Sequence, residues 1–174
     1  MVTLTQAFSD AQNAQDRVYK EKAVVKLSDN TTITLTNEDS WSNGFKIEDA
    51  VSNHDSFDIG AVVMNQITLT INNIDGRFDD VDFLGANITA YVGIYGINDE
   101  VIYGKYDVME SPRYSDGIIT LIGYDYVHKL AKVYDGSETF PESMRVLVRH
   151  AFNACGMSYE QSNINEYIPN TSDI

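Results

Sequence analysis

The sequence predicts a mainly β protein: an antiparallel β-barrel of about seven strands, with a short N-terminal helix and a small C-terminal helical segment. Apolar and polar residues alternate in short runs, which is the pattern of strands with one buried face. Glycine, asparagine and aspartate separate these runs, where turns need them. The close spacing of the runs favours an antiparallel barrel or sandwich over a parallel sheet with crossover helices.

The clearest strands lie on either side of the segment INNIDGRFDDVDFLGA, which is residues 71–86. The first strand points Ile67, Leu69 and Ile71 one way and Gln66, Thr68 and Thr70 the other, and the second alternates Ile88, Ala90, Val92 and Ile94 with Thr89 and Tyr91. Asp75-Gly76 tolerates positive φ, so the linker can turn and cross between the strands. We expect Ile67, Leu69, Ile88 and Val92 to be buried on one face of the barrel.

Other runs supply the remaining strands. A hairpin is predicted around Ser28-Asp29-Asn30, and a strand over residues 41–50 with a break at Ser42-Asn43-Gly44. Residues 101–109 and 118–122 form the last pair, the second of them after the turn at residues 114–117. We expect the strands to end near Gly123.

Helical spacing appears at both ends of the chain. Leu4, Phe8, Ala11 and Ala14 predict a helix within residues 3–18, and shorter and longer helices are predicted over residues 124–130 and 141–155. Pro141 suits the first turn of the last helix, and Gly156 suits the left-handed position after it. The predicted organisation is therefore an N-terminal helix (1–20), a barrel (21–123) and a helical segment (124–174), with a truncated further domain beginning there as an open alternative.

Composition excludes some functions. The formal charge of −14 argues against nucleic-acid or anionic-membrane binding, which need lysine and arginine at phosphates. A single cysteine, Cys155, excludes an intrachain disulfide and a cysteine-only metal site. No signal-peptide pattern and no long apolar segment occurs, so synthesis in the cytoplasm is expected.

The sequence predicts no catalytic, cofactor-binding or metal-binding residues. Asp75, Asp79, Asp80 and Asp82 crowd one linker, but their spacing differs from that of a calcium loop, and we interpret the linker as a solvated crossover whose carboxylates cap turns. His150 and Cys155 are five residues apart and diverge on a helix. His54 and His128 have no zinc-ligand pattern around them.

Eleven tyrosines and one tryptophan leave two binding functions open. Aromatic side chains at a surface can anchor a protein interface or stack on sugars. Paired carboxylates of a glycosidase are a third alternative, which sequence alone does not exclude because the two can lie far apart in the chain.

Several segments, taken in order, resemble one protein family. They are Thr5-Gln6-Ala7-Phe8, residues 56–60 leading to 65–69, Phe83-Leu84-Gly85-Ala86, residues 123–130 and residues 152–157. Together, over about residues 3–157, they resemble the amino-terminal region of the tail-tip hub, or minor structural, proteins of long-tailed phages and Gram-positive prophages.

The resemblance implies a non-enzymatic virion tail component without a cofactor. Such hubs use tube-like barrels where the tail tube meets the baseplate or central fibre, usually as trimers. The implied partners are tail tube, distal tail or fibre proteins and further copies of the chain, with no nucleic acid and no membrane. Family members commonly continue into a second barrel, so we expect a truncated chain or a split gene product. A carbohydrate-binding module and a glycoside hydrolase fragment are the alternatives.

Overall fold

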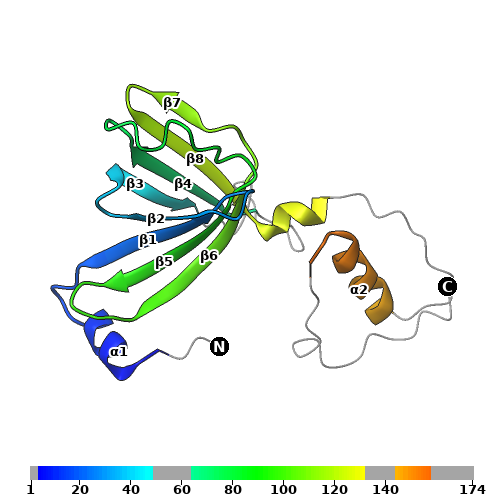
Figure 1. The fold of residues 1–174 in the computed structure, drawn as a ribbon. Helices are drawn as coiled ribbons and strands as arrows, with labels where there is room; N and C mark the ends of the chain where they lie inside the picture. The colour runs from blue at the N-terminus through cyan, green and yellow to red at the C-terminus, as the bar shows by residue number, and fades with distance from the viewer. Residues whose placement is uncertain (1–3, 49–63, 132–143, 158–174) are drawn as a thin grey trace, which may run out of the picture. The chain divides into compact units, whose positions relative to one another are not determined.

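The computed structural model describes residues 4–48, 64–131 and 144–157. The chain divides into two compact units, residues 1–126 and 127–174. The first unit contains a short helix and all the strands that the structure describes, and the second contains the C-terminal helix (Figure 1).

The first unit is a nearly closed antiparallel barrel, as predicted. Its strands follow α1 (Gln6–Gln12) and are β1 (Tyr19–Lys26), β2 (Thr32–Thr36), β3 (Ser40–Glu48), β4 (Gln66–Asn72), β5 (Asn87–Ile94), β6 (Glu100–Val108), β7 (Arg113–Ser115) and β8 (Ile118–Asp125). Neighbouring strands run in the order β2-β1-β5-β6-β8-β4-β3, and β7 pairs with β8. Strands β4 and β5 are therefore not partners, although they follow one another in the chain.

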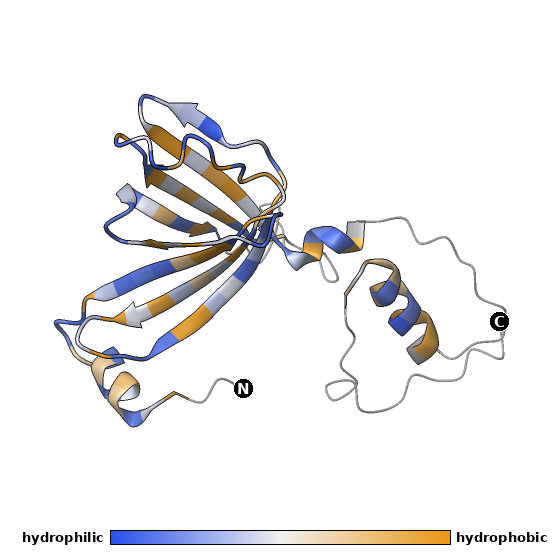
Figure 2. Cartoon of the chain, in the orientation of Figure 1, coloured by the Kyte–Doolittle hydropathy of each residue, from blue (hydrophilic) through white to orange (hydrophobic). Residues whose placement is uncertain are grey.

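Apolar side chains alternate with polar ones along the strands and form the core. The alternation is visible as bands of opposite hydropathy in Figure 2. In β4, Ile67, Leu69 and Ile71 are buried while the residues between them are partly exposed, as predicted. Leu69 pairs with Leu121 of β8, and both are fully buried. Ile88 is also buried, but the predicted burial of Val92 is wrong. Val92 is half-buried because it lines a pocket beneath α1.

The predicted hairpin of residues 23–35 is confirmed, with Ala23 opposite Leu35. The predicted break in the third strand is also present, since Asn43 has a φ of 56° and the β3–β4 register shifts between Ser40 and Phe45. Gly44 is required there: a Cβ atom at this position would lie 2.4 Å from the carbonyl oxygen of Thr70. The break is a β-bulge that bends the edge strand.

Two predicted boundaries are wrong at the end of the barrel. Strand β8 continues to Asp125 instead of ending near Gly123, because β6 pairs with residues 123–125 and β4 with residues 123–124. The predicted helix of residues 124–130 is the 3₁₀ helix η1 (Tyr126–Ala131). Strand β7 was missed, since its three exposed residues carry no alternation. It forms a hairpin with β8 around Asp116-Gly117, both of which have positive φ.

The predicted solvated crossover is wrong for four of its fourteen residues, 73–86. Between β4 and β5 the linker buries Asn73, Phe78, Phe83 and Ala86. The rings of Phe78 and Phe83 meet edge to face, with centroids 6.0 Å apart. Asn73 orders the turn, because its side-chain oxygen accepts from the Phe78 N–H at 2.8 Å and its amide donates to Asp79 at 2.7 Å. The sequence shows no alternation here, so the burial of the two rings was not apparent.

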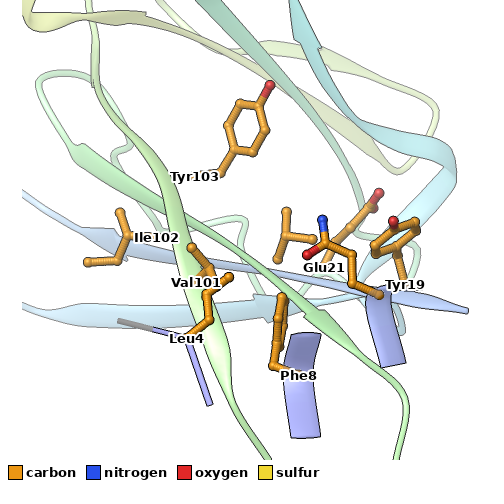
Figure 3. Close-up of a pocket in the computed structure, with 9 residues that line it drawn as sticks. Leu4, Phe8, Tyr19, Glu21, Val101, Ile102 and Tyr103 are labelled. Atoms are coloured by element: carbon orange, nitrogen blue, oxygen red, sulfur yellow. The ribbon is translucent and has the colours of Figure 1, made fainter. Parts of the chain in front are cut away.

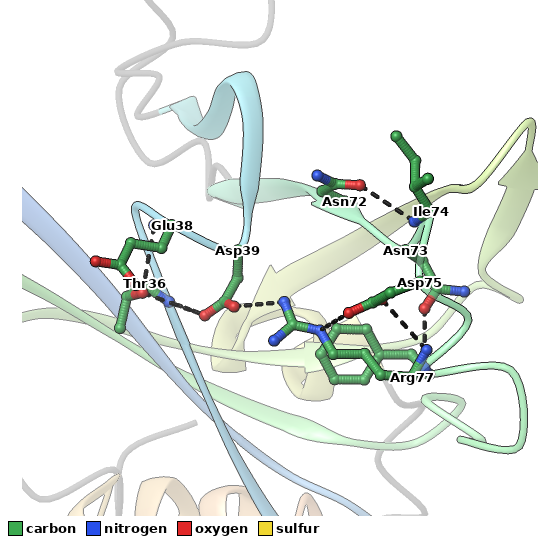
Figure 4. A network of polar contacts seen from close by, with 9 residues as sticks. Thr36, Glu38, Asp39, Asn72, Asn73, Ile74, Asp75 and Arg77 are labelled. Carbon is green, nitrogen blue, oxygen red and sulfur yellow. Dashed lines mark hydrogen bonds and ion pairs between the residues drawn. The ribbon is translucent and has the colours of Figure 1, made fainter.

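A polar network ties the crossover to the turn between the edge strands β2 and β3 (Figure 4). Asp39 accepts from the backbone N–H and hydroxyl of Thr36 at 2.8 and 3.2 Å, and Arg77 donates to its other oxygen. The Arg77 guanidinium also lies over the Phe78 ring, 4.6 Å from its centroid. Burial alone would raise the pKa of Asp39, but the Thr36 hydrogen bonds and the Arg77 charge outweigh it and lower that pKa.

The N-terminal helix is shorter than predicted. Helix α1 ends at Gln12 instead of near Val18, because Asn13 caps it through a hydrogen bond of its side-chain amide to the Ser9 carbonyl. Helix α2 (Met144–Ala154) is present, while Pro141 lies outside the described residues. Gly156 has the predicted positive φ of 69°. The hydrogen bond from the Met157 N–H to the Phe152 carbonyl completes this helix end.

Leu69→Ala tests the strand register. Leu69 is 1% exposed and faces the core, so its truncation should lower the free energy of unfolding by about 2–5 kcal/mol in urea denaturation. Thr68→Ala is the matched control on the other face and should change stability by less than about 1 kcal/mol. Equal losses in the two variants would show that the register is wrong.

Asp39→Asn tests the network at the β2–β3 turn. A carboxyl with a lowered folded-state pKa stabilises the fold above its unfolded pKa of about 3.9, and this contribution is lost as the pH falls through the folded value. The variant should therefore melt below the parent at pH 7, with the difference in Tm shrinking towards pH 3. A difference that does not change with pH would contradict an ionic role for Asp39.

Candidate protein-binding surface

Helix α1 is held against the barrel where β5 ends and β6 begins. Thr5 caps the helix by accepting from the Phe8 N–H at 3.3 Å, and its hydroxyl donates to Asp99 in the β5–β6 loop. Phe8 is the buried residue of the helix. The helix has the amphipathic spacing that the sequence indicated, and it packs on β5. The helix therefore covers part of this end of the barrel and leaves the rest open.

A pocket lies between α1 and the adjoining strands (Figure 3). Its volume is about 610 Å³. Its lining is mostly apolar and comes from α1 and its N-terminal flank, β1, β5 and β6: Leu4, Phe8, Gln12, Tyr19, Glu21, Val92, Val101, Ile102 and Tyr103. Several of these side chains are also solvent-exposed, namely Leu4, Tyr19, Ile102 and Tyr103. An apolar surface of this kind is typical of a binding site.

A bulge in β6 places Tyr103 at this pocket. The β5–β6 register shifts between Ala90 and Tyr91, so that Ala90 pairs with Gly104 and Tyr91 with Ile102. Tyr103 consequently has no residue opposite it in β5, and it is exposed. Bulges often redirect a side chain in this way at functional sites.

Glu21 is the charged residue of the pocket, and it is not among the candidate residues that the sequence predicted. Its position could have been found from the sequence: residues 19, 21, 23 and 25 share one face of β1, and Ala23 and Val25 are buried in the core. Its backbone N–H donates to Asn37 at 2.8 Å. Burial raises the pKa of the Glu21 carboxyl. No hydrogen bond or ion pair reaches this carboxylate from residues 4–48, 64–131 or 144–157.

The lysines on either side of Glu21 point to the other face of β1. Lys22 binds Glu100 and lies over the Tyr91 ring, 4.5 Å from its centroid, and Lys20 lies 3.5 Å from Glu100. The hydrogen bond from Lys22, helped by the charges of both lysines, lowers the pKa of Glu100. The two glutamates therefore have opposite environments: Glu100 is neutralised on the outer face, and Glu21 is partly desolvated on the inner face.

The described tyrosines differ in exposure, and Tyr91, Tyr124 and Tyr126 are partly buried. Tyr106 is buried in the barrel, whereas Tyr19, Tyr95, Tyr103 and Tyr114 are exposed. Tyr95 lies beside the pocket end of the barrel, since its N–H donates to the carbonyl of exposed Val18 at 2.9 Å. Tyr19, Tyr95 and Tyr103 therefore lie near α1, whereas the exposed Trp41 and Tyr114 belong to β3 and β7.

Two aspartates of the acidic linker accept hydrogen bonds from the backbone of the linker itself. Asp82 accepts from the Leu84 N–H at 2.9 Å and Asp75 accepts from the Arg77 N–H at 3.4 Å, so both cap turns as the sequence indicated. Asp79 binds Asn73, and Asp80 is exposed. Within the described part of the chain, no group of three or more His, Cys, Asp or Glu side chains could hold a metal ion.

Of the remaining candidate residues, the structure describes Cys155, His150 and His128. Cys155 is a free, partly buried thiol just after α2, and His150 lies within that helix. His128 belongs to η1, and His54 lies outside the described residues. No helix in the described residues is long and apolar enough to cross a membrane.

Comparison with known proteins gives a fold relationship. The sequence matches no protein-family profile, and it matches no curated protein. The fold is similar to that of a chain in the virion of a native gene transfer agent particle, with a TM-score of 0.53 and 10% sequence identity. The match covers 80% of this chain and 49% of that chain, so the chain spans about half the length of the protein it resembles.

Glu21→Gln tests the desolvated carboxylate. A raised folded-state pKa means that the fold prefers the protonated form, so stability is lost as the pH rises through that pKa. Removing the charge should raise Tm at pH 7 and should have little effect below about pH 4, where the carboxyl is protonated in both states.

Glu100→Gln is the matched control, because the pKa of Glu100 is lowered. It should lower Tm at pH 7. Shifts of the same sign in both variants would contradict the different environments of the two glutamates.

Proposed function

We propose that this protein is a structural component of a phage or prophage virion, located at the tail tip, and that it acts through protein–protein contacts instead of catalysis. The observation that carries the proposal is the fold shared with a virion chain, here over most of the protein. The order of sequence segments that resemble tail-tip hub proteins supports the finer assignment to the tip.

The surface chemistry supports an assembly role. At the α1 end, exposed apolar and aromatic side chains surround a pocket that the barrel does not fill. Aromatic residues and depleted charge at the centre of a patch are characteristic of protein interfaces. The net charge of −14 of the whole chain would keep the unassembled protein from associating at random.

The proposed partners are other tail proteins and further copies of this chain. A hub between a sixfold tube and a threefold fibre would repeat one heterologous contact around a closed ring, which in a trimer uses two different surfaces of each copy. We therefore propose that the surface near α1 is one of these two surfaces.

Immunogold electron microscopy of virions tests the location. Antibodies against the purified chain should label particles at the tail tip, and deletion of the gene should give particles without functional tails. The deletion phenotype should be rescued by the parent gene supplied in trans. Label on the capsid would contradict the tip assignment, and virions that lack the protein altogether would contradict the virion role.

Carbohydrate binding is a second candidate, favoured by exposed Tyr19 and Tyr103 beside the polar groups of Gln12 and Glu21. Tyrosine rings stack on sugars, and the side-chain amide and carboxylate can bind hydroxyl groups. Glycan-array binding by the purified chain that Tyr103→Ala abolishes would favour this function over assembly.

A further inference from the structure

We propose that the α1 pocket binds an arginine side chain, flanked by apolar residues, from a neighbouring protein of the particle. This inference rests on the proposed function and names the chemistry of the partner. The pocket combines an apolar wall with one carboxylate, and an arginine side chain has the matching parts: an apolar stem and a cationic planar head.

The carboxylate of Glu21 supplies the charge of the pocket. It lies on the inward face of β1, continuing the row of buried Ala23 and Val25, and it lines the pocket beside Phe8 and Val92. A partly desolvated carboxylate is costly unless a cation or hydrogen-bond donor meets it. The cations nearest in sequence are engaged elsewhere, since Lys20 and Lys22 bind Glu100 and Arg17 binds the Ala14 carbonyl and the Tyr19 hydroxyl.

Charge and shape favour a cationic side chain over an apolar one as the group that enters the pocket. Acidic residues outnumber basic ones by 26 to 12, so the surface as a whole attracts positive groups. A guanidinium can form paired hydrogen bonds with a carboxylate and stack on an aromatic ring. The pocket rim already shows a cation–aromatic contact, because the Arg17 guanidinium lies 5.8 Å from the centroid of the Tyr19 ring. Arginine therefore suits Glu21 and the tyrosines better than lysine, which lacks the planar head.

The exposed apolar side chains define what flanks the arginine. Leu4 and Ile102 line the pocket and are each more than 40% exposed. They would be covered by apolar residues of the partner on either side of the inserted side chain. A buried charged anchor surrounded by apolar contacts is the usual arrangement of an interface hot spot.

The test is a titration of the full chain by two-dimensional ¹⁵N–¹H NMR, with two peptides that differ only in charge. The probes are acetyl-Leu-Arg-Leu-amide and acetyl-Leu-citrulline-Leu-amide, in which citrulline replaces the guanidinium with a neutral urea. The arginine peptide should shift the signals of Gln12, Val92 and Val101 and bind at least about tenfold more tightly, since a charge-assisted hydrogen bond is worth more than a neutral one.

Two variants identify the carboxylate responsible. Glu21→Gln should abolish the preference for the arginine peptide, while Glu38→Gln, which removes the same charge at an exposed position outside this pocket, should retain it. Equal binding of the two peptides by the parent, an equal loss of preference in both variants, or no shift of the pocket signals with either peptide would overturn the proposal. Because immunogold labelling does not depend on this pocket, failure here is distinguishable from failure of the tail-tip assignment.

Discussion

The contact between Phe78 and Phe83 is the interaction on which the arrangement of the barrel depends. Strands β4 and β5 follow one another in the chain but have different neighbours, so the linker between them must cross the barrel. Two aromatic rings buried in the core hold that crossing in place. Burying such rings provides a few kcal/mol each, which offsets part of the entropy lost by ordering the linker, about 1–2 kcal/mol for each residue.

The crossover is also connected to the edge strands of the sheet. Arg77 stacks on Phe78 and binds Asp39, which fixes the turn joining β2 to β3, the two strands at the open edges of the sheet. At the start of β5, Ala86 accepts from the Val108 N–H at 2.8 Å, so the end of the crossover is bonded to β6. Backbone groups at the start of β5 therefore find their hydrogen-bonding partners within the chain. At the other end of β5, where α1 packs, apolar side chains and Glu21 remain available to a partner.

Periodicity explains how much of this could be predicted. Ile67, Leu69 and Ile71 follow a strict two-residue repeat, and the bulge at Asn43-Gly44 has a local signature in residues that tolerate positive φ. Phe78 and Phe83 lie in a segment without a repeat, and their burial depends on contacts with distant strands. Glu21 could have been predicted as an inward-facing charge from the alternation of β1, but the pocket around it depends on where α1 packs and on the β6 bulge.

Amide hydrogen exchange, measured on the free protein and on the assembled particle, is the most direct test. It shows whether the start of β5 is stabilised by the crossover of the chain itself and the end of β5 by a partner. The account predicts that residues 73–86 exchange slowly in both states, while residues 4–22 and 92–103, part of which already pair within the sheet, become further protected on assembly. Rapid exchange of residues 73–86 in the free protein, or protection on assembly that leaves the α1 end unchanged, would contradict it.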